Sequence, residues 1–447
     1  MNNTQSPFDK VNSWIKNSVG LKLGTITILM LLLLIPASMI KSIISEREML
    51  NQSVLNEVSQ KWAGKQQING PILTIPLTYE HSSEDNKTIT ETKYLYILPE
   101  KININGDIEP EKLKRGIYEV VVYKSILDFK GQFKPNTKID QNGLKEINYD
   151  KAFLTVGISD LRGIKDQITL NWGNQKLDVQ AGSKLSEMVS SGISIDLPDL
   201  REQINSTIDF SFQLNLQGSQ NLSFIPLGST TKVKLSSTWS SPSFNGNFLP
   251  DNREVSDEGF SADWKILQLN RNYPQTWIDK NMRNEMLYSA LGVDLIMPLD
   301  DYQKSMRSSK YAVMTIALIF LVFFLVEILN GRKIHPFQYT LVGLALCLFY
   351  ILLISISEHS NFNIAYLISA GITSLMILIY AKSVFKSGKF TGVLTATILG
   401  IYGFLFVTLQ LADYALLMGS IGLALILGVT MYFTRNINWY KLNMKTE

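Results

Sequence analysis

Residues 21–40, LKLGTITILMLLLLIPASMI, form an apolar stretch near the start of the chain. A helix needs about 20 mostly apolar residues to cross a bilayer core about 30 Å thick, so this stretch is long enough to span a membrane. Lysines precede or open the stretch and small residues stand near its end, at Lys10, Lys16, Lys22, Ala37 and Ser38. We expect an uncleaved anchor over residues 21–43, because the run is long for a signal peptide and lacks a clear small-x-small site. A cleaved signal peptide is the alternative.

Five further apolar stretches lie in the last third of the chain, at Tyr311–Leu329, Phe337–Ser355, Ile364–Ala381, Gly392–Gln410 and Tyr414–Phe433. Only Ala412 and Asp413 separate the last two, which predicts a tight hairpin. The chain is therefore expected to have six transmembrane helices, the last five forming a block over 311–433. Residues 44–310 are mostly polar and charged, which predicts a large soluble domain between the first and second helices.

The basic residues between these helices predict the orientation of the chain. They occur after the second helix, after the fourth helix and in the tail, at Arg332, Lys333, Lys382, Lys386, Lys389, Arg435, Lys441 and Lys445. The gaps at 358–363 and around Asp413 contain no Lys or Arg. Because short basic segments stay in the cytoplasm, we expect residues 1–20 and 434–447 to be cytoplasmic. The large domain would then lie outside the cytoplasm, which in a bacterium is the periplasm.

The large domain has the pattern of a β-rich fold. Leu50, Val54, Val58 and Trp62 recur every four residues, which predicts an amphipathic helix that leads into the domain. Period-two or β-branched runs follow between turn residues, and they include 72–77, 94–98, 102–104, 117–131, 153–158, 168–172, 208–216, 222–225 and 231–235. Many short strands with regular turns predict an antiparallel, sandwich-like fold. Trp277–Leu287 is expected to form a short helix.

Several stretches resemble the CreD family of bacterial inner-membrane proteins. They are Gly70–Pro76, Leu98–Pro99, Arg115–Val120 with Tyr123, Ser159–Gly163, Leu216–Ser219, Thr238–Pro250, Gly259–Trp264 and Arg271. The resemblance covers nearly the whole chain, although polar Ser240 and Ser241 stand where a bulkier pair is expected. It implies a role in cell-envelope integrity and, in some bacteria, a link to a two-component response to wall-active antibiotics. It implies no defined reaction.

Within these stretches, large aromatic and basic side chains are the candidate site residues. Trp239, Phe244, Phe248, Phe260 and Trp264 would either pack as an aromatic cluster or form an exposed surface for a glycan, lipid or protein. Arg115 and Arg271 would either form structural ion pairs or bind an anion. We favour the packed and paired alternatives.

Glu327 is an ionisable residue near the predicted cytoplasmic end of the second membrane helix. Such groups are costly within a membrane and are often functional. Arg332 and Lys333 follow about one helical turn later, so we expect an interfacial ion pair with these bases; a proton relay is the alternative.

Signals for catalysis are weak. The sequence contains no H-E-x-x-H, C-x-x-C, phosphate-binding Gly-Lys loop or G-x-S-x-G motif, and its S-x-x-K matches lack companion motifs. The three histidines, His81, His335 and His359, are not all on one side of the membrane in the predicted topology, so they cannot share a metal. The lone Cys347 lies in an apolar run and forms no intrachain disulfide. We expect no cofactor.

Three functions remain open. The first is a non-enzymatic envelope protein whose outer domain senses or binds an envelope component or protein partner. The second is a transporter or lipid-handling protein, against which the sequence shows no broken helix pair and few buried polar groups. The third is an enzyme that uses carboxylates as acid and base. Beyond the lipid bilayer no partner is identified, and a net charge of +3 without a long basic run argues against nucleic acid.

Overall fold

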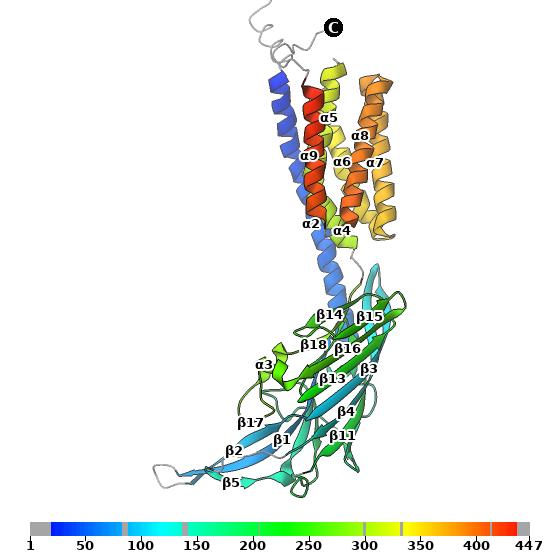
Figure 1. The fold of residues 1–447 in the computed structure, drawn as a ribbon. Coiled ribbons are helices and arrows are strands. Elements are labelled where there is room, and N and C mark those ends of the chain that lie inside the picture. Colours follow the sequence, from blue (N-terminus) through cyan, green and yellow to red (C-terminus); the bar gives the residue numbers. More distant parts are fainter. Residues whose placement is uncertain are drawn as a thin grey trace, which may run out of the picture. The chain divides into compact units, whose positions relative to one another are not determined.

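The computed structural model describes residues 19–82, 88–135, 142–204, 206–297, 301–330, 334–411 and 414–435. The chain divides into two compact units (Figure 1). The helical unit comprises Met1–Asn51 and Leu299–Glu447, and the β-rich unit comprises Gln52–Pro298. Residues 301–310 belong to the helical unit, whereas the sequence pattern placed them in the outer domain.

The helical unit contains α2 (Val19–Trp62, whose last turns belong to the β-rich unit), α4 (Asp301–Lys310), α5 (Ala312–Asn330), α6 (Pro336–Ser357), α7 (Phe362–Phe385), α8 (Gly388–Gln410) and α9 (Ala415–Thr434). The predicted anchor and the predicted amphipathic helix after it are one continuous helix, α2. Four described helices are long and apolar enough to cross a membrane, or five if α4 and α5 form one span. The apolar part of α9 is shorter, at Leu417–Tyr432.

Local sequence explains where two of these helices begin. His335 caps α6: its Nδ1 accepts a hydrogen bond from Phe337 N, and Pro336 occupies the first turn, where no backbone N–H is needed. Asn361 caps α7, with its side-chain oxygen 3.0 Å from Ile364 N. The α4–α5 pair is bent by 46°, which contradicts the expectation that no helix pair is broken.

The β-rich unit is built from two sheets. The ten-stranded sheet is ordered β14-β18-β12-β1-β6-β10-β9, with β2 and β5 also paired to β1 and β17 paired to β2. Its strands are β1 (Gln66–Ser82), β2 (Thr88–Ile97), β5 (Leu144–Ile147), β6 (Phe153–Ile158), β9 (Gln180–Ala181), β10 (Gly192–Asp196), β12 (Asn221–Phe224), β14 (Pro242–Gly246), β17 (Thr276–Ile278) and β18 (Leu291–Leu295).

The eight-stranded sheet is ordered β15-β16-β13-β3-β4-β11-β7-β8. Its strands are β3 (Lys101–Arg115), β4 (Tyr118–Phe133), β7 (Thr169–Trp172), β8 (Gln175–Asp178), β11 (Ile208–Ser219), β13 (Thr230–Ser237), β15 (Asn252–Ser256) and β16 (Gly259–Leu267). Side chains alternate strictly between buried and exposed along the first half of β3, so one face of this sheet packs inward and the other faces solvent.

The two sheets share one large apolar core. Phe129 of β4 and Phe224 of β12 bring ring centroids of the two sheets within 6.4 Å of each other. A second core covers the other face of the ten-stranded sheet and includes Ile72, Met286 and Trp277. The sandwich-like, β-rich prediction is therefore confirmed.

Two details of that prediction are wrong. The fold is not wholly antiparallel, because β1 pairs with β12 and β3 pairs with β13 in parallel. The short helix expected over Trp277–Leu287 forms only in the second half of that stretch. Trp277 lies in β17, and a single short helix, α3, spans Arg283–Tyr288. Trp277 pairs with Tyr96 at the sheet edge and is buried, so tertiary packing has overridden the local helical pattern.

Candidate functional site

Trp239 lies in the core of the β-rich unit. Its side chain is 9% exposed, and its indole Nε1–H donates to the backbone oxygens of Ser241 and Ile296, both 3.1 Å away. Lys112 places its ammonium 5.5 Å from the ring centroid. A ring with its polar atom paired inside the protein is a structural anchor rather than an open binding surface.

The neighbouring aromatic residues are packed in the same way. Phe244 contacts Phe260 and Trp264 edge-to-face, at centroid distances of 5.7 and 5.8 Å. Trp264 is buried and donates to the backbone oxygen of Phe248, which fixes the loop before β15. These contacts favour the packed aromatic cluster over the exposed surface that the sequence left open.

The two candidate arginines have different roles. Arg115 forms an ion pair with Glu57 at 2.8 Å, as expected. Hydrogen bonding to Lys61, together with the charge of Arg115, lowers the pKa of Glu57. Arg271 has no carboxylate partner among the described residues; its guanidinium instead donates to the backbone oxygens of Tyr273 and Leu227. Arg271 thus ties two loops together, and the predicted ion pair is wrong for this residue.

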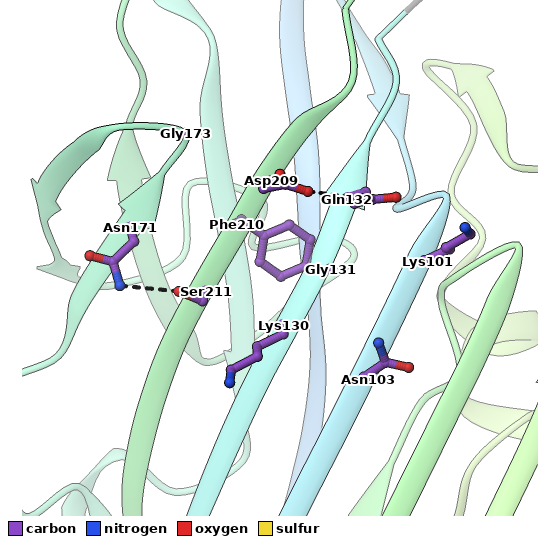
Figure 2. A pocket seen from close by; sticks show the side chains of 10 residues that line it. All are labelled: Lys101, Asn103, Lys130, Gly131, Gln132, Asn171, Gly173, Asp209, Phe210 and Ser211. Carbon is purple, nitrogen blue, oxygen red and sulfur yellow. Dashed lines mark hydrogen bonds between the residues drawn. The ribbon is translucent and has the colours of Figure 1, made fainter.

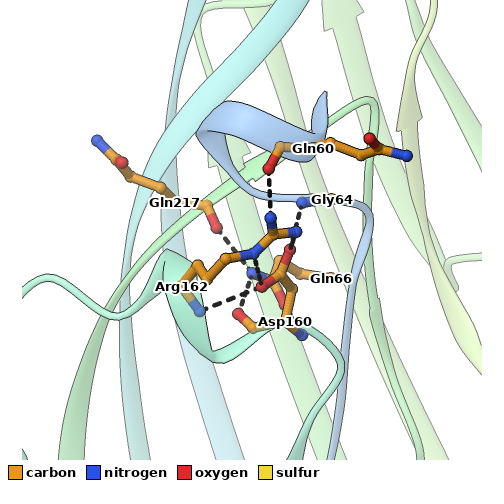
Figure 3. Close-up of polar contacts among 6 residues, drawn as sticks. All are labelled: Gln60, Gly64, Gln66, Asp160, Arg162 and Gln217. Atoms are coloured by element: carbon orange, nitrogen blue, oxygen red, sulfur yellow. Dashed lines mark hydrogen bonds and ion pairs between the residues drawn. The ribbon is translucent and has the colours of Figure 1, made fainter. Parts of the chain in front are cut away.

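The end of α2 is held by an ion pair between Asp160 and Arg162, which were not among the residues that the sequence singled out as candidates (Figure 3). The Asp160 carboxylate accepts hydrogen bonds from Gly64 N (2.9 Å) and Arg162 N (3.1 Å), as well as from the Arg162 guanidinium. That guanidinium also donates to the backbone oxygen of Gln60, one of the carbonyls left unpaired at a helix end. These bonds, chiefly those from the Arg162 side chain, lower the pKa of Asp160 to about 2.

Two motifs of the family resemblance meet at this point. Buried Gln66 donates to the backbone oxygens of Asp160 and Gln217, each 2.9 Å away (Figure 3). A side chain at Gly163 would collide with Gln66 and the Gln217 carbonyl, and one at Gly218 would collide with the Gln66 side chain. The glycine in each of the stretches Ser159–Gly163 and Leu216–Ser219 was the feature of the sequence that could have indicated this close packing. The arrangement attaches a helix to a sheet and contains no reactive group.

The solvent face of the eight-stranded sheet is polar and shallowly hollowed. A hollow of about 390 Å³ lies over β3, β4, β11 and β7 (Figure 2). A second hollow of about 380 Å³ shares Lys130, Asn171 and Ser211 with the first. Lysine, amide and hydroxyl side chains line both hollows and can donate hydrogen bonds to a polar ligand. Carboxylates also contribute, from Asp209 in the first hollow and from Asp128 and Asp166 in the second.

In the helical unit, Glu327 is buried and fully paired. Its Oε1 accepts from the Lys22 ammonium and from Ile334 N (2.7 Å), and its Oε2 accepts from the Tyr339 hydroxyl (2.8 Å). The bases expected to pair with it, at 332 and 333, lie outside the described residues. The observed base comes from α2, so this carboxylate joins α2, α5 and α6. That arrangement fits an ion pair better than a proton relay.

The interior of the helical unit also holds buried hydroxyl groups. Ser369, Thr373 and Ser374 of α7 and Tyr402 of α8 have side-chain oxygens without a hydrogen-bond partner among the described residues. The sequence had predicted few buried polar groups, and this expectation is wrong. Unpaired polar groups in an apolar bundle are energetically unfavourable, so they often mark a functional site.

A metal centre is not apparent. No group of three or more His, Cys, Asp or Glu side chains that could hold an ion occurs among the described residues. The side chain of His81 lies outside them. Cys347 is buried in the helical bundle, as its apolar surroundings predicted.

Known proteins match the chain over almost its entire length. The family model described as "Inner membrane protein CreD" matches residues 18–440. A protein of Escherichia coli (strain K12), named "Inner membrane protein CreD", is 34% identical over 419 residues, which cover 93% of this chain and 92% of that protein. The match includes both the helical and the β-rich unit.

Proposed function

The chain belongs to the CreD family of inner membrane proteins, and from that premise we propose that it maintains the integrity of the cell envelope without catalysing a reaction. Its β-rich unit would bind or sense an envelope component, and its helices would anchor it and relay the bound state. The match of both units to one family is the observation that carries this proposal.

The proposal includes a topology. The chain crosses the membrane six times, with both termini in the cytoplasm and the β-rich unit in the periplasm. The positions of Lys382, Lys386, Lys389 and Arg435 support this orientation, because they lie at the end of α7, the start of α8 and the end of α9, which would face the cytoplasm. The apolar helices of the helical unit support a multi-pass arrangement.

The α2 helix suits a relay. It continues without interruption from an apolar part in the helical unit to Trp62 in the β-rich unit. Its far end is attached to the sheets by Asp160 and Arg162, and its apolar part is attached to α5 through the Lys22–Glu327 pair. A ligand that displaced the Asp160 loop would therefore act on one end of α2.

Gene deletion tests the proposed function. A strain without the gene should be more sensitive to detergent and to wall-active antibiotics, and a plasmid copy of the full chain should restore resistance. Growth and morphology that remain unchanged in the deletion strain under these treatments would contradict the proposal.

A lipid-handling or transport function is the second candidate, favoured by two observations. The α4–α5 pair is bent, and α7 presents buried hydroxyls without described partners. Broken helices and buried polar groups commonly line paths through a membrane. Vesicles containing the purified chain would test this function with fluorescent phospholipids and an impermeant quencher. Rapid lipid exchange that is abolished by Ser369→Ala and Ser374→Ala would favour it over the first candidate.

A further inference from the structure

One line of side chains crosses the solvent face of the eight-stranded sheet at right angles to its strands. The strand registers place these residues side by side on seven successive strands: Lys265, Lys232, Asn103, Lys130, Ser211, Asn171 and Lys176. We call this line the lysine row. Six gaps of about 4.8 Å between strands make it about 29 Å long.

The lysine row is electropositive. Four of its members are lysines and none is acidic, and none of the four forms a salt bridge within the part of the chain that the structure describes. Lys232 and Lys265 stand directly opposite each other on adjacent strands. Like charges in that position are unfavourable. Charge repulsion that lowers stability, with no contact in the fold that offsets it, is typical of a functional site.

The neutral members of the row can bind hydroxyl groups. Asn171 Nδ2 donates to Ser211 Oγ at 3.1 Å, which fixes the orientation of both side chains (Figure 2). The two hollows described above lie along the row, and Lys130, Asn171 and Ser211 line both of them. A ligand that follows the row through the hollows would meet both cationic and uncharged hydrogen-bonding groups, with carboxylates at the edges of the hollows.

In the rows on either side, carboxylates offset the charge of the exposed lysines Lys101 and Lys234. Asp209 accepts from Gln132 Nε2 at 2.9 Å, and Asp128 accepts from Gln213 Nε2 at 3.0 Å. An anionic bilayer would be better matched by a broad basic patch, because its charge extends in two dimensions. A row of four lysines between rows without net positive charge is better matched by a linear anionic chain.

We propose that the lysine row binds an anionic polysaccharide of the cell envelope, laid across the strands. The lysines would pair with its carboxylates or phosphates, and the asparagine and serine side chains would bind its hydroxyls. This inference rests on the proposed function and specifies its ligand class and binding surface.

Binding of a defined polyanion tests the inference. The full chain in detergent micelles is titrated with polygalacturonate, which carries a carboxylate on each sugar, and binding is followed by biolayer interferometry. The double variant Lys130→Gln/Lys232→Gln should bind about tenfold more weakly, since each exposed charge pair contributes modestly. The matched control, Lys124→Gln/Lys234→Gln, alters exposed lysines on the same two strands outside the row and should retain the wild-type Kd.

Four outcomes would overturn the inference. The first is that the wild type does not bind polygalacturonate, and the second is that both double variants weaken binding equally. The third is that the fully methyl-esterified polymer, which has no charge, binds as tightly as the acidic polymer. The fourth is that phosphatidylglycerol vesicles bind and are weakened by Lys130→Gln/Lys232→Gln to the same extent as the polymer. If the wild type fails to bind the polymer but its gene still restores a sensitive deletion strain, only this inference is lost. If deletion has no phenotype while row-dependent binding persists, the proposed function is lost instead.

Discussion

Replacing Asp160 by asparagine should destabilise the β-rich unit by about 1–2 kcal/mol at neutral pH. The fall of the Asp160 pKa from 3.8 to about 2 corresponds to about 2 kcal/mol of stability. The Asp160 side chain is only 14% exposed, but that of Arg162 is 61% exposed, so solvent screening reduces the contribution of this pair. Asparagine fills the same space, but it removes the charge and replaces one of the two accepting oxygens by an NH2 group.

The effect should depend on pH in a defined direction. The pKa of Asp160 is lower in the folded state, so its stabilising contribution is complete above the unfolded pKa of about 4 and disappears as the pH falls toward 2. The stability of the wild type should therefore approach that of Asp160→Asn over this range.

Urea unfolding of the full chain in micelles, followed by tryptophan fluorescence, measures this difference. Five of the seven tryptophans, at 62, 172, 239, 264 and 277, lie in the β-rich unit, so the signal reports mainly on that unit. Asp178→Asn, at an exposed position on β8, is the matched control and should change stability by less than about 0.5 kcal/mol. Equal effects of the two substitutions at neutral pH, or a loss at Asp160 that is as large at pH 2 as at pH 7, would refute the reasoning.

Three other substitutions should have measurable effects. Trp239→Ala should destabilise the β-rich unit by about 3–5 kcal/mol in the same urea assay, because it removes a buried ring; Leu269→Ala, at an 86% exposed position, should not. An unaltered midpoint for Trp239→Ala would show that the ring contributes no packing. Glu327→Leu should lower the thermal stability of the helical unit by about 3–5 kcal/mol, and adding Lys22→Leu should cost less than the sum of the single changes; strict additivity would mean that the pair is not coupled. Gly163→Ala should cost about 1–3 kcal/mol, because its methyl group would overlap the network in Figure 3, and wild-type stability would contradict that packing.

The length and periodicity of the apolar runs were sufficient to predict most of the helices and strands. The run at 153–158 is β6, and the apolar stretch from Phe337 is α6, because a buried strand or a membrane helix needs a continuous apolar sequence of the right length. The boundary after the anchor could not be predicted. The sequence predicted an anchor that ends near residue 43 and a separate amphipathic helix that includes Trp62, yet the two form one continuous helix, α2.

Contacts between distant segments were harder to predict from one sequence. Glu327 was expected to pair with bases a few residues away, but Lys22, 305 residues earlier, lies beside it. The parallel pairing of β3 with β13 brings Asn103 next to Lys232, so the lysine row exists only once the register is known. No period in the sequence connects those positions, because loops of variable length separate the strands.

Cysteine labelling tests most directly whether the β-rich unit lies outside the cytoplasm. In a Cys347→Ala background, Asn174→Cys places one thiol in an exposed turn of the β-rich unit, and Lys389→Cys places one at the start of α8. A membrane-impermeant maleimide should label Asn174→Cys in intact spheroplasts and Lys389→Cys only after permeabilisation. Labelling of Lys389→Cys but not of Asn174→Cys in intact spheroplasts would contradict the proposed orientation and, with it, a periplasmic ligand.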